Sequence, residues 1–295
     1  MINDFKIGVI ADSFRVGIDE SVKKAASVGA QGLQLYATSG EMSPESLSAR
    51  RKREILDRIE SNGMVVSAIC GDMGGHGFVI ASDNIIRIEK SKRIMELAKE
   101  LKSNIVTTHI GVIPSDENHP RWEVLAEACE ALGTFAQGMG SYFAIETGPE
   151  KAVVLKKFLD AIGSKGLAVN YDPANLVMVT GDDPVEGVRV LKEYIVHTHA
   201  KDGIMIKQTD PEIIYNYFAE GGIEDINLKD YFLETPLGEG SVDFTSYLKV
   251  LGEVGFNGFL TIEREVGSSP EADITLAVSF LKRLIAKQTE RANDV

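Results

Sequence analysis

The chain has 295 residues, of which 44% are hydrophobic, enough to build the core of one large domain or two smaller ones. Its 44 acidic and 31 basic side chains give a net charge of −13, which repels nucleic acid and anionic membrane surfaces, so we expect a small-molecule substrate and no nucleic-acid partner. Cys70 and Cys129 form no disulfide or zinc motif, and no leader or long apolar span is recognisable, so we expect a cytoplasmic protein with no membrane partner.

Eight apolar runs have the composition of buried strands. They lie at about residues 6–11, 31–36, 64–70, 104–109, 142–146, 167–172, 194–199 and 258–263. Amphipathic stretches between them predict helices at about residues 19–29, 44–62, 82–102, 121–138, 150–162, 183–192 and 243–254, and a last helix at 271–290.

Two of these helices have recognisable ends. Ser43 and Pro44 predict an N-terminal cap and a first-turn proline, and Asn62-Gly63 predicts the end of the same helix. Ser82 precedes the next helix, which is predicted to run to about Lys102. The apolar positions of that helix lie near helical spacing: Ile85, Ile86, Ile94, Leu97 and Leu101.

Strands that alternate with helices through the whole chain imply parallel pairing, because each helix brings the next strand back alongside the last one. Eight such units predict an α/β fold, a single (β/α)8 (TIM) barrel domain that covers residues 1–295. An open, doubly wound sheet is the alternative, but no GxGxxG pattern follows the first strand.

The connection after the seventh strand, at about residues 202–242, is much longer than an ordinary loop. It is predicted to be a lid, a subunit contact in a homo-oligomer, or an irregular helical insertion packed on the barrel. It contains aromatic residues with acidic residues between them; the aromatic residues are Tyr215, Tyr217, Phe218, Tyr231 and Phe232.

Four polar side chains occupy the ends of the fifth to eighth strands: Glu146, Asp172, His199 and Glu263. Active sites of such barrels form at these strand ends, so the four side chains are expected to meet. Three carboxylates placed close together need a cation or protons to offset their charge. Because these ligands are oxygen-rich and include no thiolate, the sequence predicts one divalent metal ion, with Mn²⁺ or Mg²⁺ favoured over Co²⁺ or Zn²⁺.

Two assignments within this set have alternatives. His197 and His199 face the same side of a regular strand, and we choose His199 as the ligand because it is nearer the strand end. His197 is then expected one layer deeper, as a support or a substrate contact. Glu265 shares a face with Glu263 if the strand continues, and we favour Glu263 as the ligand.

The chain resembles the xylose isomerase-like barrel superfamily, the sugar phosphate isomerase/epimerase group related to endonuclease IV, over nearly its whole length. The segments that carry the resemblance are Ile145-Glu146, Asp172-Pro173-Ala174-Asn175, His199-Ala200-Lys201-Asp202, Gly238-Glu239-Gly240-Ser241-Val242-Asp243-Phe244 and Gly258-Phe259-Leu260-Thr261-Ile262-Glu263. The resemblance implies that the four strand-end residues bind one divalent metal, and that Glu146 and Glu263 also act as a catalytic acid/base pair on a keto sugar or polyol-derived ketone.

Further candidates for substrate binding surround this set. They are Gln34, His109, Asn175, His197 and Lys201. Ketose 3-epimerases of the superfamily usually have histidine where this chain has Asn175, and an arginine a few residues beyond the metal histidine, where this chain has none before Arg264.

These observations favour a metal-dependent sugar isomerase or epimerase that works through an enediolate. A dehydratase or lyase that acts on a keto-inositol or keto-sugar is the nearest alternative, because it begins with the same proton abstraction. A non-catalytic sugar-binding barrel is the third reading.

Overall fold

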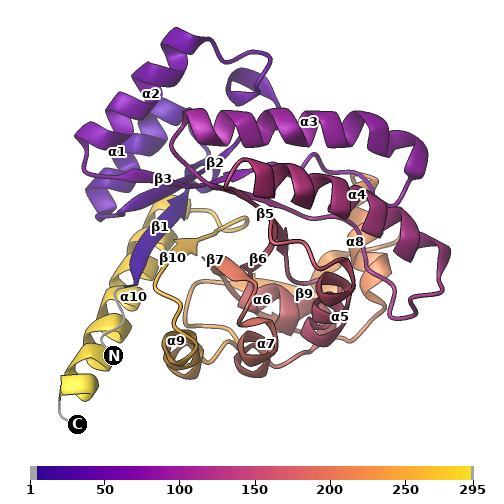
Figure 1. Ribbon diagram of the computed structural model, residues 1–295. Coiled ribbons are helices and arrows are strands. Elements are labelled where there is room, and N and C mark those ends of the chain that lie inside the picture. The colour runs from indigo at the N-terminus through magenta and orange to yellow at the C-terminus, as the bar shows by residue number, and fades with distance from the viewer. Residues whose placement is uncertain (1–4, 294–295) are drawn as a thin grey trace.

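A computed structural model of the protein describes residues 5–293, and within this range eight parallel strands close into a barrel (Figure 1). The predicted (β/α)8 fold is therefore confirmed. Going round the barrel from β1, the strands follow one another in chain order, with β10 closing the ring between β7 and β1. The eight strands are β1 (Lys6–Ile10), β2 (Gly32–Tyr36), β3 (Val65–Cys70), β4 (Ile105–Thr108), β5 (Tyr142–Glu146), β6 (Leu167–Tyr171), β7 (Ile195–Ala200) and β10 (Phe259–Ile262).

Helices surround the strands, and their apolar faces form one core with the outward face of the barrel (Figure 1). The longer helices are α1 (Ile18–Val28), α2 (Ala49–Ser61), α3 (Ala81–Glu100), α4 (Pro120–Gly138), α5 (Ala152–Ile162), α7 (Pro184–Leu191), α9 (Phe244–Glu253) and α10 (Pro270–Asn293). Short helical turns are η1 (Ala11–Phe14), η2 (Gly40–Met42), α6 (Pro173–Asn175) and the π-helical turn η3 (Leu176–Thr180). No helix in the described range is long and apolar enough to cross a membrane.

The predicted start of the second helix is wrong. Pro44 begins only a short turn, in which the backbone N–H of Leu47 donates to the carbonyl of Ser43 (2.9 Å), and the buried Leu47 side chain then anchors the chain. Helix α2 begins at Ala49, where the hydroxyl of Ser48 accepts the N–H of Arg51. Its predicted end is confirmed, because the helix stops at Asn62 and Gly63 adopts a positive φ of 73°.

Two apolar residues of helix α3 lie outside the core. Ile85 and Ile86 are 74% and 63% exposed, whereas Ile94, Leu97 and Leu101 are buried as predicted. In the first turns of α3 the buried residue is Asn84, and Ile85 and Ile86 follow it on other sides of the helix, which face away from the barrel.

The long connection after β7 is a packed insertion with its own secondary structure. Strand β8 (Asp202–Met205) pairs antiparallel with β9 (Phe232–Thr235), and helix α8 (Pro211–Ala219) and the turn η4 (Leu228–Asp230) lie between them. Arg264 Nη1 donates to Glu234 Oε1 of β9 (2.7 Å), which ties this hairpin to the segment after β10.

Asp202 holds the insertion to the glycine-rich segment that precedes α9. Its Oδ1 accepts the backbone N–H groups of Gly203 (2.8 Å) and Val242 (3.1 Å), and its Oδ2 accepts those of Gly238 (2.9 Å) and Gly240 (3.0 Å). The Cβ of any other residue at position 240 would lie 2.1 Å from Asp202 Oδ1, so only glycine fits this close approach. Asp202 thus fixes the path of the segment 238–242.

Loss of this carboxylate is predicted to destabilise the fold. Asp202→Ala leaves four backbone donors without a partner, so we expect the free energy of unfolding to fall by about 3 kcal/mol. Asp243→Ala is the matched control, because Asp243 caps α9 at the surface, where a lost cap costs about 1 kcal/mol. Urea denaturation measures the free energy of unfolding of both variants, and the Asp202 variant should lose more. Equal losses in the two variants would contradict the special role of Asp202.

Candidate functional site

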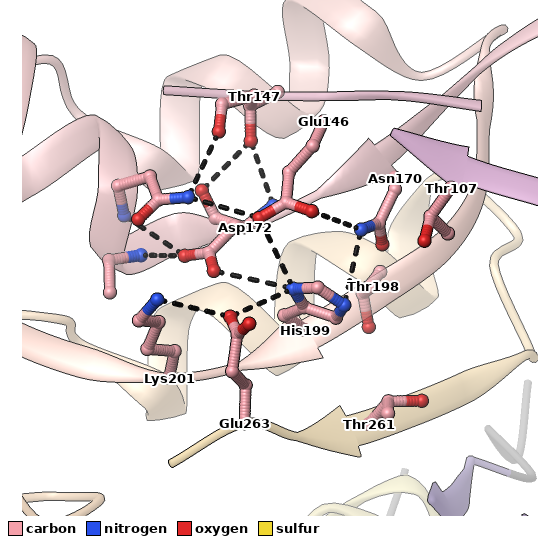
Figure 2. A network of polar contacts seen from close by, with 12 residues as sticks. Thr107, Glu146, Thr147, Asn170, Asp172, Thr198, His199, Lys201, Thr261 and Glu263 are labelled. Atoms are coloured by element: carbon pink, nitrogen blue, oxygen red, sulfur yellow. Dashed lines mark hydrogen bonds and ion pairs between the residues drawn. The ribbon is translucent and has the colours of Figure 1, made fainter. Parts of the chain in front are cut away.

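Four side chains meet at the carboxyl-terminal ends of adjacent strands, as predicted (Figure 2). Glu146 ends β5 and Asp172 follows β6, while His199 lies in β7 and Glu263 follows β10. We call these residues the four-residue cluster. His199 Nδ1 lies 3.4 Å from Glu146 Oε1, 3.5 Å from Asp172 Oδ2 and 3.1 Å from Glu263 Oε2.

The cluster has the donor atoms of a divalent metal site. One ligand atom from each side chain lies within 4.8 Å of the others, and every member is buried. Asp172 Oδ2 and His199 Nδ1 are buried without a hydrogen-bond partner in the described structure. Such atoms are costly unless an ion or a proton engages them, so this set of three carboxylates and one imidazole fits a single hard or borderline cation.

Asp172 divides its two oxygens between the cluster and the fold. Its Oδ1 accepts the backbone N–H groups of Ala174 (2.8 Å) and Asn175 (2.9 Å), which caps α6. Pro173 occupies the first position of that turn, where its missing N–H costs nothing. The cap fixes the side-chain rotation, so that Oδ2 points into the cluster.

A layer of neutral side chains supports the cluster from below. Asn170 Nδ2 donates to Glu146 Oε2 (3.0 Å), and Gln34 Oε1 accepts from His199 Nε2 (3.1 Å). Gln34 Nε2 in turn donates to Thr107 Oγ1 (3.2 Å), which fixes the orientation of the amide. This arrangement places the His199 proton on Nε2 and leaves the lone pair of Nδ1 for a metal ion.

His197 lies one layer below His199, and of its two expected roles its position favours support. Its Nδ1 donates to Asn170 Oδ1 (2.9 Å), and its Nε2 accepts from Thr261 Oγ1 (3.0 Å). Burial, and then the neighbouring His199, hold the pKa of His197 well below its ordinary value, so the ring is neutral. Both nitrogens are engaged and the residue does not line the cavity, which leaves no atom for a substrate.

Lys201 lies beside the cluster on the side of β10. Its Nζ contacts Glu263 Oε2 at 3.1 Å and Glu265 Oε2 at 2.6 Å. Burial alone raises the pKa of Glu263, but Lys201 and His199 outweigh it and hold the value below the usual range. Glu265 is half exposed and belongs to the cavity rim, and the cluster takes Glu263, as predicted.

His109 faces the cluster from the end of β4. Its Nδ1 lies 2.9 Å from Asp72 Oδ2, and its Nε2 lies 3.7 Å from Glu146 Oε1. Burial lowers the pKa of His109, but Glu146 and the hydrogen bond to Asp72 outweigh it and raise the pKa to about 10. Asn175 lies on the same side, where its Nδ2 donates to Glu146 Oε1 (3.1 Å).

A cavity of about 210 Å³ opens above the cluster. Gln34, His109, Asn175 and Lys201, predicted to bind substrate, all line it. Helix α8 of the insertion contributes Tyr215 and Phe218, and the glycine-rich loop after β3 contributes Gly74 and Gly75.

These two segments are joined at the cavity mouth. His76 Nε2 lies 2.6 Å from Glu220 Oε1, next to the C-terminal end of α8. The insertion therefore reaches the cavity, as a lid would.

Several polar residues in and around the site were not predicted. Asp72 stands two residues beyond the end of β3, so the same strand-end argument could have found it. Asn170 lies in β6, two residues before Asp172, so the alternation of side chains along the strand could have found it. Glu150 is a buried carboxyl close to His109, and burial raises its pKa to about 8. No pattern in the sequence distinguishes it from a surface glutamate.

We predict that the cluster binds one divalent ion per chain. Without an ion, burial lowers the pKa of His199, but Glu263 and Glu146 raise it well above the ordinary value, so a proton competes with the metal. Mn²⁺ affinity should therefore weaken as pH falls. At 100 times its dissociation constant, Mn²⁺ should stabilise the protein by about 2.7 kcal/mol.

Calorimetry measures the Mn²⁺ affinity at each pH, and thermal melts measure the stabilisation. His76→Ala removes a histidine outside the cluster and is the control, which should bind Mn²⁺ like the wild type. Full metal occupancy in a Glu146→Ala/His199→Ala variant would contradict the assignment.

The charge of His109 in the metal-free protein provides a second prediction. A histidine whose folded pKa is about 10 adds stability that is complete below about pH 6.5, its unfolded value, and disappears as pH rises through 10. Nuclear magnetic resonance titration of the imidazole should find it protonated at pH 8. Asp72→Asn should lower its pKa, and a wild-type value near 6.5 would exclude the ion pair.

The sequence matches the family model described as xylose isomerase-like TIM barrel over residues 22–284. Among curated proteins, it is 27% identical over 154 residues to the inosose dehydratase of Clostridium botulinum (strain Alaska E43), a match that covers 50% of this chain and 48% of the relative. It is 26% identical over 183 residues to the rhizopine catabolism protein MocC of Rhizobium meliloti, which covers 57% and 52%. The chain thus spans about half the length of these curated relatives.

Solved structures share the fold over the whole barrel. A xylose isomerase domain protein of Planctomyces limnophilus superposes with a TM-score of 0.78 at 24% identity, over 97% of this chain and 99% of that one. The probable 3-DHS dehydratase AsbF of Bacillus anthracis gives a TM-score of 0.75 at 19% identity, over 94% and 99%. Because the family model matches most of the sequence, the chain belongs to the xylose isomerase-like TIM barrel family.

Proposed function

We propose that the protein is a divalent-metal-dependent enzyme that removes a proton next to the ketone of a small polyol or sugar. The observation that carries this proposal is the position of two buried carboxylates, Glu146 and Glu263, in a cation-binding cluster at the floor of a cavity. Binding alone needs no such pair, so the site favours an enzyme over a non-catalytic sugar-binding barrel.

The four-residue cluster would hold the ion, most simply Mn²⁺ or Mg²⁺. When bound, the ion supplies Lewis acidity that polarises the ketone and acidifies the neighbouring C–H bond. The protein residues supply the proton transfers and the orientation of the substrate.

Glu263 and Glu146 are the two candidate bases. Lys201 keeps Glu263 ionised, as a base must be before it accepts a proton. Glu146 has one oxygen held by Asn170 and the other by Asn175, so its carboxylate is oriented before substrate binds. The strands that carry the two glutamates, β5 and β10, are separated by β6 and β7, which supports a mechanism in which the two carboxylates act from different sides of the substrate.

Loss of water is the outcome that we favour after proton abstraction. His109 has a raised pKa in the metal-free protein, lies against Asp72 and lines the cavity, which suits it to give a proton to a departing hydroxyl group. The names of the curated relatives support the same reaction class, since several are inosose dehydratases. The candidate substrate is therefore a keto-inositol or a similar keto-polyol.

Isomerisation or epimerisation is the second candidate. It is favoured by the opposed carboxylates, because one can remove a proton and the other can return it to another face or carbon. The superfamily resemblance weakens the specific ketose 3-epimerase reading, because Asn175 replaces the usual histidine and donates to Glu146. A homo-oligomer and a cytoplasmic location stay predictions.

Proton exchange tests the shared first step. We expect the Mn²⁺-loaded protein in D2O to incorporate deuterium into at least one member of a panel of keto-inositols and ketoses. An enone or diketone product, detected by ultraviolet absorbance, indicates dehydration, and an isomer of unchanged mass indicates isomerisation.

Glu146→Gln and Glu263→Gln should each lower the exchange rate by about 10²–10⁴-fold. Metal content is measured in parallel, because both residues are also candidate ligands. Glu271→Gln, an exposed glutamate on α10, is the control and should exchange like the wild type. If the variants at Glu146 and Glu263 keep both the metal and full exchange activity, the two glutamates have no acid/base role.

A further inference from the structure

The cavity has few positive charges, and each is already engaged by carboxylates. The charged side chains that line it, apart from the cluster, are Asp72, His109, Lys201 and Glu265. No arginine of the described chain lines it. An anionic substrate group needs a free cation or a set of free N–H donors.

Lys201 is held between two carboxylates. Only 5% of its side chain is exposed, and its Nζ contacts Glu263 Oε2 at 3.1 Å and Glu265 Oε2 at 2.6 Å. Glu265 reaches it from the outer side, with 55% of its own side chain exposed. A ligand entering the cavity therefore meets the Glu265 carboxylate before it meets the ammonium group.

Three further donors near the cavity, on His109, Gly74 and Arg264, are engaged too. His109 is paired with Asp72 and lies near Glu146. The backbone N–H of Gly74 in the lining loop donates to Asp72 Oδ1 (2.7 Å). Arg264, next to the cluster in sequence, turns away, and its guanidinium bonds Glu234 (2.7 Å) and Asp273 (2.8 Å).

The formal charge of the site remains negative even with a metal ion. Five carboxylates (Asp72, Glu146, Asp172, Glu263 and Glu265) face at most two cations, Lys201 and His109, which leaves at least three negative charges. A divalent ion offsets two of them. The low dielectric of a partly enclosed cavity makes the remaining charge more repulsive to an anion than it is at an open surface.

We infer that the site selects uncharged polyol ketones and rejects phosphorylated or carboxylated ones, and that Glu265 is the residue that sets this preference by occupying Lys201. The inference rests on the proposed function, whose substrate class it narrows. Glu265 pairs with the Lys201 ammonium group, which would otherwise attract an anion, and its own carboxylate repels one. Binding sites exclude competitors of similar shape by such repulsive contacts.

Matched ligands test the preference in the wild-type protein. Calorimetry with the Mn²⁺-loaded protein compares myo-inositol with myo-inositol 1-phosphate, and D-fructose with D-fructose 6-phosphate. We expect the neutral member of each pair to bind more tightly, by about 30-fold at low ionic strength, from one unfavourable charge contact. Added salt should narrow the difference, because it screens the repulsion. Tighter binding of the phosphorylated members would overturn the inference.

Glu265→Gln tests the residue. Its half-exposed position makes the substitution compatible with folding. We expect the preference for the neutral ligand to fall about tenfold, because Lys201 loses its outer partner and the rim loses a negative charge. Glu271→Gln removes the same charge from an equally exposed residue on the outer face of the molecule, and should leave the preference unchanged. An unchanged preference in Glu265→Gln would overturn the role of Glu265.

The two proposals fail in different ways. If neutral ligands bind but no compound exchanges a proton in D2O, the proposed function fails and the charge selection stands. If a phosphorylated or carboxylated ketone binds more tightly and exchanges fastest, the charge selection fails and the proton-abstraction chemistry stands. Binding is measured without turnover, so neither result depends on the other.

Discussion

Repulsion between buried carboxylates is the constraint to which the rest of the site responds. Glu146, Asp172 and Glu263 are brought together by the closure of the barrel, and no arrangement of neutral residues alone would make that tolerable. Three side chains offset this repulsion: His199 lies between the carboxylates, Lys201 lies beside Glu263, and His109 lies beside Glu146. What remains unpaired is a set of lone pairs directed at one point, which is the condition for holding a cation.

The neutral side chains below the cluster fix the orientation of its ligands. Asn170 donates to Glu146, and Gln34 fixes the proton of His199, so neutral amides orient these two ligands. Glu263 is held differently, by the ammonium group of Lys201. Neutral donors orient a carboxylate without weakening its attraction for an ion. The charged supports, Lys201 and His109, stand at the sides, where they also face the cavity.

Much of the fold and the cluster could be predicted from sequence because both follow from regular alternation. Buried strands appear as apolar runs, and parallel strands bring their last residues to one edge. The start of α2 could not be predicted, because Ser43-Pro44 and Ser48 both have the features of an N-terminal cap. The burial of Leu47, which the sequence does not reveal, decides between them.

The parts of the cavity wall that come from the loop after β3 and from helix α8 could not be predicted from the sequence. They depend on the paths of two long connections, which are set by contacts between residues far apart in the chain, such as His76 with Glu220.

The double use of Asp172 has an evolutionary consequence. One oxygen caps a helical turn while the other faces the ion, so a substitution that removes the ligand also removes the cap. A descendant that no longer needed the metal would still lose stability by changing this residue. Selection for folding alone would then preserve Asp172, and its presence in a relative is weaker proof of retained catalysis than the presence of Glu146 and Glu263.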